Sequence, residues 1–197
     1  MSGAHAAYDG RMRLSALLVP LLLAGLAPAS AAQEEKPAAP PSIYDEQADA
    51  RADVQAAVAR AAKKNKRVLV MWGGNWCVWC HRLHAVLKRG RVAREMLYEY
   101  ELVLVDSQGN RDFAAELGAD LGQGVPFLTV LDAAGKVVTQ QETAALEAGD
   151  GHDEAKVLAF LQQHRAAPQD ASRVLAEARV RAAREKKRVF LRFGAPW

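Results

Sequence analysis

Apolar residues in the middle of the chain follow two kinds of pattern. Continuous apolar runs of a few residues are typical of strands buried on both faces of a sheet, whereas apolar residues spaced three and four apart are typical of helices. The continuous runs predict strands at 68–72, 102–105 and 127–131. The helical spacing predicts helices at about 45–64, from 77 onward, at 91–99, at 110–117 and at 153–165.

The segment after the last apolar run predicts a hairpin. Asp132 to Gly135 has the composition of a turn, and 136–140 can return as a strand beside 127–131. The predicted order is then helix, strand, helix, strand, helix, strand, strand, helix. This order predicts an α/β sandwich, in which helices cover both faces of a mixed sheet.

The composition is that of an ordinary globular protein, with 50% hydrophobic and 25% charged residues. The net charge is only +3, and basic residues are interspersed with acidic ones along the chain. Basic clusters at 63–67 and 184–188 end helix-like stretches, where cations offset the helix dipole. The charge pattern therefore predicts no nucleic-acid partner.

The N-terminus has the pattern of a secretory signal peptide. Arg11 and Arg13 precede an apolar stretch at 14–26, which is shorter than the roughly 20 residues that a membrane-spanning helix needs. Ala29 and Ala31 fit the small-residue pattern of a cleavage site. We therefore expect an exported protein, periplasmic or extracellular, without stable membrane insertion; an uncleaved anchor is the alternative.

The domain boundaries follow from this pattern. We predict a signal peptide at 1–32, so that the mature chain begins near Ala32 or Gln33, and a linker rich in proline and alanine at 33–44. The predicted sandwich then occupies 45–166.

The only two cysteines of the chain, Cys77 and Cys80, have C-x-x-C spacing at the start of a predicted helix. Two sulfurs at this spacing can reach each other across one helical turn, and the helix N-terminus stabilises a thiolate. Outside the cytosol such a pair meets oxidising conditions. The pattern predicts a protein-disulfide oxidoreductase with no cofactor beyond this redox-active disulfide, acting on protein thiols and disulfides together with a redox partner protein.

The position of each residue in the motif suggests its role. Cys77, expected to be exposed at the helix start, is the predicted nucleophile, and Cys80, one turn deeper, is the predicted resolving thiol. Trp76 and Trp79 would flank the sulfurs as an apolar surface for a substrate peptide, although Trp79 fits an ordinary half-buried aromatic equally well. His81 could stabilise the thiolate by adding positive charge beside it.

Three features give the chain a resemblance to the thioredoxin-like superfamily over about 45–166. They are Trp76-Cys77-x-x-Cys80 between a strand and a helix, Val125-Pro126 before a later strand, and the turn at Asp132–Gly135. More narrowly, the chain resembles exported members with a Trp-Cys-x-Trp-Cys-His centre. The resemblance implies that Pro126 is cis and faces the dithiol, and that the backbone of Val125 pairs with an extended substrate.

One position departs from the pattern of the family. The resemblance implies a buried acid six residues before the first cysteine, and Met71 stands there. Water, His81 or a carboxylate from another part of the chain would have to replace it as a proton relay.

Two other functions fit the same motif. The run from Cys77 to His81 satisfies C-x-x-C-H, the pattern for covalent haem attachment. Alternatively, Cys77, Cys80, His81 and His84 lie on one helix face and could bind copper or zinc in a metal-binding module. Four ligands on one straight helix cannot surround zinc tetrahedrally, so the main prediction includes no metal ligand.

The chain also repeats part of itself at an offset of 121 residues. Lys66-Arg67-Val68 matches Lys187-Arg188-Val189, and Gly73 and Trp76 match Gly194 and Trp197. Fixed-offset repeats usually report duplicated units. We therefore expect 167–197 to begin a truncated second thioredoxin-like repeat of a longer tandem protein, with a helix at 171–187 and a strand at 188–193; a chance similarity between alanine-rich helices is the alternative.

Overall fold

The computed structural model describes residues 41–192. One α/β domain holds most of the secondary structure, and its sheet and covering helices lie between Ala50 and His164. The α-helices are α1 (Ala50–Lys64), α2 (Val78–Leu87), α3 (Gly90–Glu99), α4 (Arg111–Glu116), α5 (Glu154–His164) and α6 (Ala171–Arg184), with short 3-10 helices at Leu121–Gln123 and Thr143–Leu146. The strands are β1 (Arg67–Gly73), β2 (Tyr100–Asp106), β3 (Phe127–Leu131), β4 (Val137–Glu142), β5 (Glu147–Ala148) and β6 (Gly151–His152).

The main sheet has four strands in the order β2-β1-β3-β4. β1 pairs in parallel with β2 and antiparallel with β3, and β3 pairs antiparallel with β4. The central strands β1 and β3 are almost completely buried, as their continuous apolar runs predict. β2 is at an edge, and its Leu102 and Leu104 are only partly buried although they belong to a continuous apolar run.

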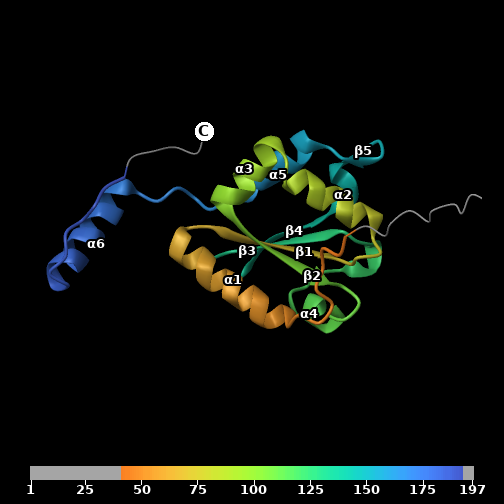
Figure 1. Cartoon of the computed structure of the whole chain (residues 1–197), viewed down its shortest axis with the longest axis horizontal. Coiled ribbons are helices and arrows are strands. Elements are labelled where there is room, and N and C mark those ends of the chain that lie inside the picture. The colour runs from red at the N-terminus through yellow and green to blue at the C-terminus, as the bar shows by residue number, and fades with distance from the viewer. Residues whose placement is uncertain (1–40, 193–197) are drawn as a thin grey trace, which may run out of the picture. The chain divides into compact units, whose positions relative to one another are not determined.

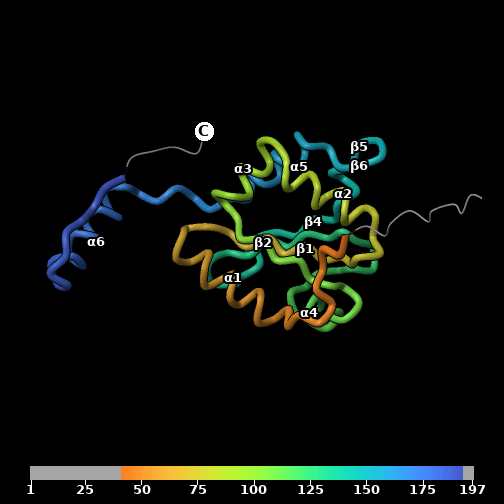
Figure 2. The backbone as a smooth tube through the Cα atoms, viewed as in Figure 1, coloured from red at the N-terminus to blue at the C-terminus, as the bar shows by residue number. Residues whose placement is uncertain are grey.

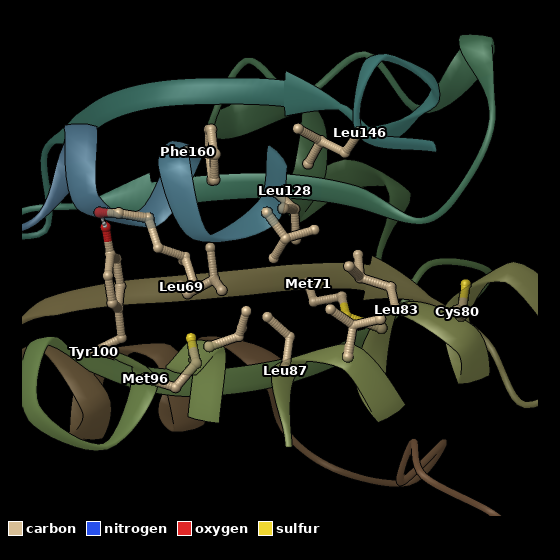
Figure 3. Close-up of a cluster of buried hydrophobic side chains, with 14 of the residues drawn as sticks. Leu69, Met71, Cys80, Leu83, Leu87, Met96, Tyr100, Leu128, Leu146 and Phe160 are labelled. Carbon is tan, nitrogen blue, oxygen red and sulfur yellow. Dashed lines mark hydrogen bonds between the residues drawn. The ribbon is translucent and has the colours of Figure 1, made fainter. Parts of the chain in front are cut away.

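Helices cover both faces of the sheet, which confirms the predicted α/β sandwich (Figure 1). Alternate residues of β1 enter two separate cores. Leu69 and Met71 pack beneath α2, α3 and α5, in the cluster shown in Figure 3. Val70 and Trp72 belong to the other cluster, together with residues of α1 and α4.

The first helix is shorter than its predicted range of 45–64. Asp49 is its N-cap, because its carboxylate accepts hydrogen bonds from the backbone N–H groups of Arg51 and Ala52. The helix ends at Lys64, and its C-cap residue Asn65 adopts the left-handed conformation. Residues 41–49 therefore lie outside the helix and extend toward the end of the sheet where β1 ends.

The small hairpin of β5 and β6 was not predicted. Each of its strands has two residues, too few to produce an alternating pattern in the sequence. β6 contacts α2, and Figure 2 labels both short strands near that helix. The hairpin brings His152 to the helix that begins at the cysteines.

Several predictions concern residues that the structure does not describe. The signal peptide, most of the linker, and Gly194 and Trp197 of the predicted repeat lie beyond residues 41–192. Within the described part of the chain, no helix is both long enough and apolar enough to span a membrane.

The C-terminal segment agrees only in part with the prediction. A helix forms at Ala171–Arg184, but residues 188–192 form no strand. An apolar run becomes a strand only where another strand can pair with it. Within residues 41–192, the two sheets contain only β1 to β6, so no strand pairs with residues 188–192. The second repeat itself stays a prediction.

None of the residues of α6 is buried. We therefore predict that truncation after Asp170 changes the free energy of unfolding by no more than about 0.5 kcal/mol, the usual range for surface changes. Guanidinium unfolding of the truncated and full-length chains measures this difference.

A matched pair of substitutions controls this experiment. Leu161→Ala in α5 removes a fully buried side chain and should cost about 2–5 kcal/mol, whereas Val174→Ala in α6 should cost little. A loss of several kcal/mol on truncation would mean that the tail is part of the first domain.

Candidate redox site

The two cysteines lie at the N-terminus of α2, just beyond the end of β1. Cys77 is the N-cap residue, and its Sγ accepts a hydrogen bond from the backbone N–H of Cys80 at 3.1 Å. The two residues form a disulfide across the first turn, with their Cα atoms 5.2 Å apart. The spacing in the sequence therefore corresponds to a closed dithiol at a helix start.

Both sulfur-bearing residues are buried, which corrects the prediction that Cys77 is exposed. Cys77 is 5% exposed and Cys80 is 0% exposed. The Sγ of Cys77 lies 3.6 Å from the carbonyl oxygen of Val125, so the loop before β3 covers it. Both cysteines belong to the apolar cluster under α2, in which Figure 3 labels Cys80, but only the Cys77 sulfur meets this loop.

The loop that faces Cys77 has the geometry that the family resemblance implies. The Val125–Pro126 peptide bond is cis, Pro126 is buried and Val125 is half-buried. The carbonyl oxygen of Pro126 accepts a hydrogen bond from the buried hydroxyl of Thr143 at 2.7 Å. This bond holds the loop in place, and the neighbouring Val125 carbonyl oxygen faces the Cys77 sulfur.

The two tryptophans of the motif have different surroundings. Trp76 is 58% exposed and lines a pocket of about 400 Å³ together with Ser107, Leu121 and Val125. Trp79 is half-buried against the core. Its ring packs edge-on against the His152 ring, with the two ring centroids 5.5 Å apart, and the Arg82 guanidinium lies 4.8 Å from the centroid of the Trp79 ring. Trp76 thus borders the open side of the site, and the ring of Trp79 is occupied by packing contacts.

Asn75 connects the site to the segment before α1, a role that the sequence did not reveal. Its Oδ1 accepts hydrogen bonds from the backbone N–H groups of Ile43 and Tyr44, both at 2.9 Å. Its Nδ2 donates to the carbonyl oxygen of Tyr44, also at 2.9 Å. The Nε2 of His81 lies 2.9 Å from the Asn75 carbonyl oxygen, and because a carbonyl only accepts, Nε2 must carry the hydrogen.

Tyr44 and Asp106 lie behind the disulfide. Tyr44 is 2% exposed, and its hydroxyl has no hydrogen-bond partner within residues 41–192. Burial, and then the charge of Asp106, raise the pKa of Tyr44 well above its ordinary value. Asp106 is buried at the end of β2, where its Oδ2 accepts a hydrogen bond from the Gly109 N–H at 2.8 Å. Met71, by contrast, is fully buried in the apolar cluster.

Gly73 is the point at which these groups meet. It is paired with Asp106 in the parallel ladder of β1 and β2. A Cβ at this position would overlap both the Tyr44 hydroxyl and the Cys80 sulfur. The hydroxyl and the buried sulfur therefore lie close together, against the same stretch of backbone.

Two features of the geometry bear on the alternative functions, a metal-binding module and covalent haem attachment. Across residues 41–192, no group of three or more His, Cys, Asp or Glu side chains is arranged to hold a metal ion. Haem attachment through both cysteines needs both sulfurs at the surface, whereas Cys80 is fully buried.

Comparison with known proteins agrees with this geometry. Residues 49–133 match the model of a family described as thioredoxin-like. The domain has a thioredoxin-like fold.

Two solved structures are reported as similar to this chain. A disulphide isomerase from Xylella fastidiosa Temecula1 is 24% identical over 61% of this chain and 95% of that chain, with a TM-score of 0.54, which shows a shared fold. The C-terminal domain of DsbD from Neisseria meningitidis, in its oxidised form, is 21% identical over 58% of this chain and 96% of that chain, with a TM-score of 0.43. No curated protein matches the chain.

We predict that the thioredoxin-like domain does not tolerate a side chain at Gly73. In Gly73→Ala the new methyl group overlaps the Tyr44 hydroxyl and the Cys80 sulfur, and such overpacking typically costs about 1–3 kcal/mol. Guanidinium unfolding of the oxidised protein measures the loss. Gly151→Ala is the control, because its Cβ meets no atom within 4 Å; equal stability of the two variants would contradict the close contact.

Proposed function

We propose that the chain is an exported thiol–disulfide oxidoreductase that exchanges disulfides with protein substrates through Cys77 and Cys80. The observation that supports this most strongly is the asymmetric disulfide at the start of α2. One of its sulfurs faces the cis-proline loop, and the other is fully buried.

The surroundings of Cys77 favour its role as the nucleophile. The backbone N–H of Cys80 already points at the Cys77 sulfur, 3.1 Å away. Once the disulfide is reduced, this N–H and the positive end of the helix dipole stabilise a thiolate there. Cys77 is also the cysteine nearer to Val125 and to the exposed Trp76.

The exchange proceeds in two displacements. The Cys77 thiolate attacks one sulfur of a substrate disulfide, a new bond joins Cys77 to the substrate, and the other substrate sulfur leaves as a thiolate. The Cys80 thiolate then attacks the Cys77 sulfur, the mixed disulfide breaks, and the second substrate sulfur leaves. The substrate gains two electrons and the protein ends with the Cys77–Cys80 disulfide. The reverse sequence oxidises a substrate dithiol, and a redox partner protein restores the starting state.

The substrate would lie over the disulfide in an extended conformation. The backbone of Val125, held next to the cis bond to Pro126, can pair with the backbone of a peptide. Trp76 borders the pocket beside this loop and offers apolar surface for a side chain of that peptide. The signal-peptide pattern at 1–32 supports a periplasmic or extracellular location, where protein disulfides persist.

The Cys80→Ser variant tests the assignment of roles. Attack by Cys77 remains, but no thiol resolves the product, so mixed disulfides with a model protein that carries an exposed disulfide should accumulate more than about tenfold over wild type. Non-reducing gels and mass spectrometry of the adduct measure this accumulation.

Cys77→Ser is the matched control and should form few adducts, because its remaining thiol is buried. Equal accumulation through Cys80 would reverse the two roles. Adducts with neither variant, from fully reduced protein, would contradict the proposed function.

A further inference from the structure

Tyr44 combines two properties that packing alone does not explain. Its side chain is almost completely buried, yet within residues 41–192 its hydroxyl has no hydrogen-bond partner. A buried, unpaired hydroxyl destabilises a folded protein. Tyr100, the other buried tyrosine in this part of the chain, instead donates to the Leu161 carbonyl oxygen at 2.6 Å.

The Tyr44 hydroxyl is held beside the sulfur of Cys80. Both groups lie close to the position that a Cβ at residue 73 would take, and they can do so because glycine has no Cβ. Asn75 anchors the backbone of Tyr44 through its N–H and its carbonyl oxygen. Asn75 precedes Cys77 by two residues, so the same loop positions the hydroxyl and the disulfide.

Opening the disulfide creates a charge next to this hydroxyl. When an incoming thiolate attacks the Cys77 sulfur, the Cys77–Cys80 bond breaks and its electron pair stays on the Cys80 sulfur. Cys80 is fully buried, and an unsolvated charge there is costly unless a donor reaches it. The same thiolate must form again when Cys80 resolves a mixed disulfide.

We propose that the Tyr44 hydroxyl donates a hydrogen bond to the Cys80 thiolate and thereby assists both the opening of the disulfide and the resolution of mixed disulfides. The inference rests on the proposed function, since it concerns the same exchange. It assigns a use to a hydroxyl that is unpaired while the disulfide is closed.

The neighbours of Tyr44 suit it to remain a donor. Met71 offers no proton-carrying group from β1, and the carboxylate of Asp106 is already engaged with the Gly109 N–H. Asp106 is the one charged group that contributes to the raised pKa of Tyr44, and burial contributes more. The phenol therefore keeps its proton through neutral and mildly alkaline pH, and it acts by hydrogen bonding rather than by giving up its proton.

Tyr44→Phe tests the proposal, because it removes the hydroxyl and keeps the ring. Reduced protein is mixed with a dithiobis-nitrobenzoate reagent, which releases one coloured thiolate when Cys77 attacks and a second when Cys80 resolves the mixed disulfide. In the variant the first release should be unchanged. The second should slow by about tenfold or more at neutral pH, the usual effect of losing a hydrogen bond to a charged group. The pH at which the second release is half-maximal should rise.

Tyr100→Phe is the matched control, because it removes the hydroxyl of an equally buried tyrosine away from the sulfurs. It should leave both releases unchanged while lowering the stability of the oxidised protein, since the Leu161 carbonyl loses its donor. Tyr44→Phe should not lower the stability of the oxidised protein, because its hydroxyl is unpaired in that state.

Three results would overturn the proposal. The second release in Tyr44→Phe could match that of wild type, it could slow equally in Tyr100→Phe, or Tyr44→Phe could markedly destabilise the oxidised protein. Each of these leaves the proposed function standing. Wild-type protein that never gives a second release would overturn both the inference and the proposed function.

Discussion

The close approach of three segments at Gly73 is the constraint on which the site depends. β1 ends there, and the Gly73 carbonyl oxygen accepts a hydrogen bond from the Ser107 N–H at 2.7 Å, which extends the pairing with β2. Because Gly73 has no side chain, Cys80 packs against it from α2 and Tyr44 packs against it from the segment before α1. A larger residue would push the buried sulfur away from the sheet.

This packing makes the two ends of the disulfide chemically different. The Cys77 sulfur meets two polar groups, the backbone N–H of Cys80 and the carbonyl oxygen of Val125. The Cys80 sulfur is buried among apolar side chains, with the Tyr44 hydroxyl as its polar neighbour. In the proposed exchange, an incoming thiolate therefore attacks the first sulfur, and the negative charge develops on the second. The direction of attack in the proposed exchange follows from this difference.

Local patterns in the sequence predicted most of the fold and the centre of the site. Continuous apolar runs gave β1 and β3, and the C-x-x-C spacing gave a disulfide at a helix start. Contacts between distant residues were missed: Asn75 binds a segment more than thirty residues earlier, and Tyr44 lies beside the sulfur of Cys80. Periodic patterns in a sequence reflect local helix or strand structure, so they do not predict such contacts. The exposure of Cys77 and the strand predicted from 188 were wrong because covering loops and pairing partners are properties of the whole fold.

Equilibration with glutathione measures whether Cys77 and Cys80 form a reversible dithiol. The protein is incubated in mixtures of reduced and oxidised glutathione, its free thiols are trapped, and each redox form is counted by mass spectrometry. We expect a single two-electron transition between dithiol and disulfide, reached from either side, with little glutathione mixed disulfide at the midpoint. A disulfide that never forms, or a protein that accumulates only glutathione adducts, would contradict this expectation.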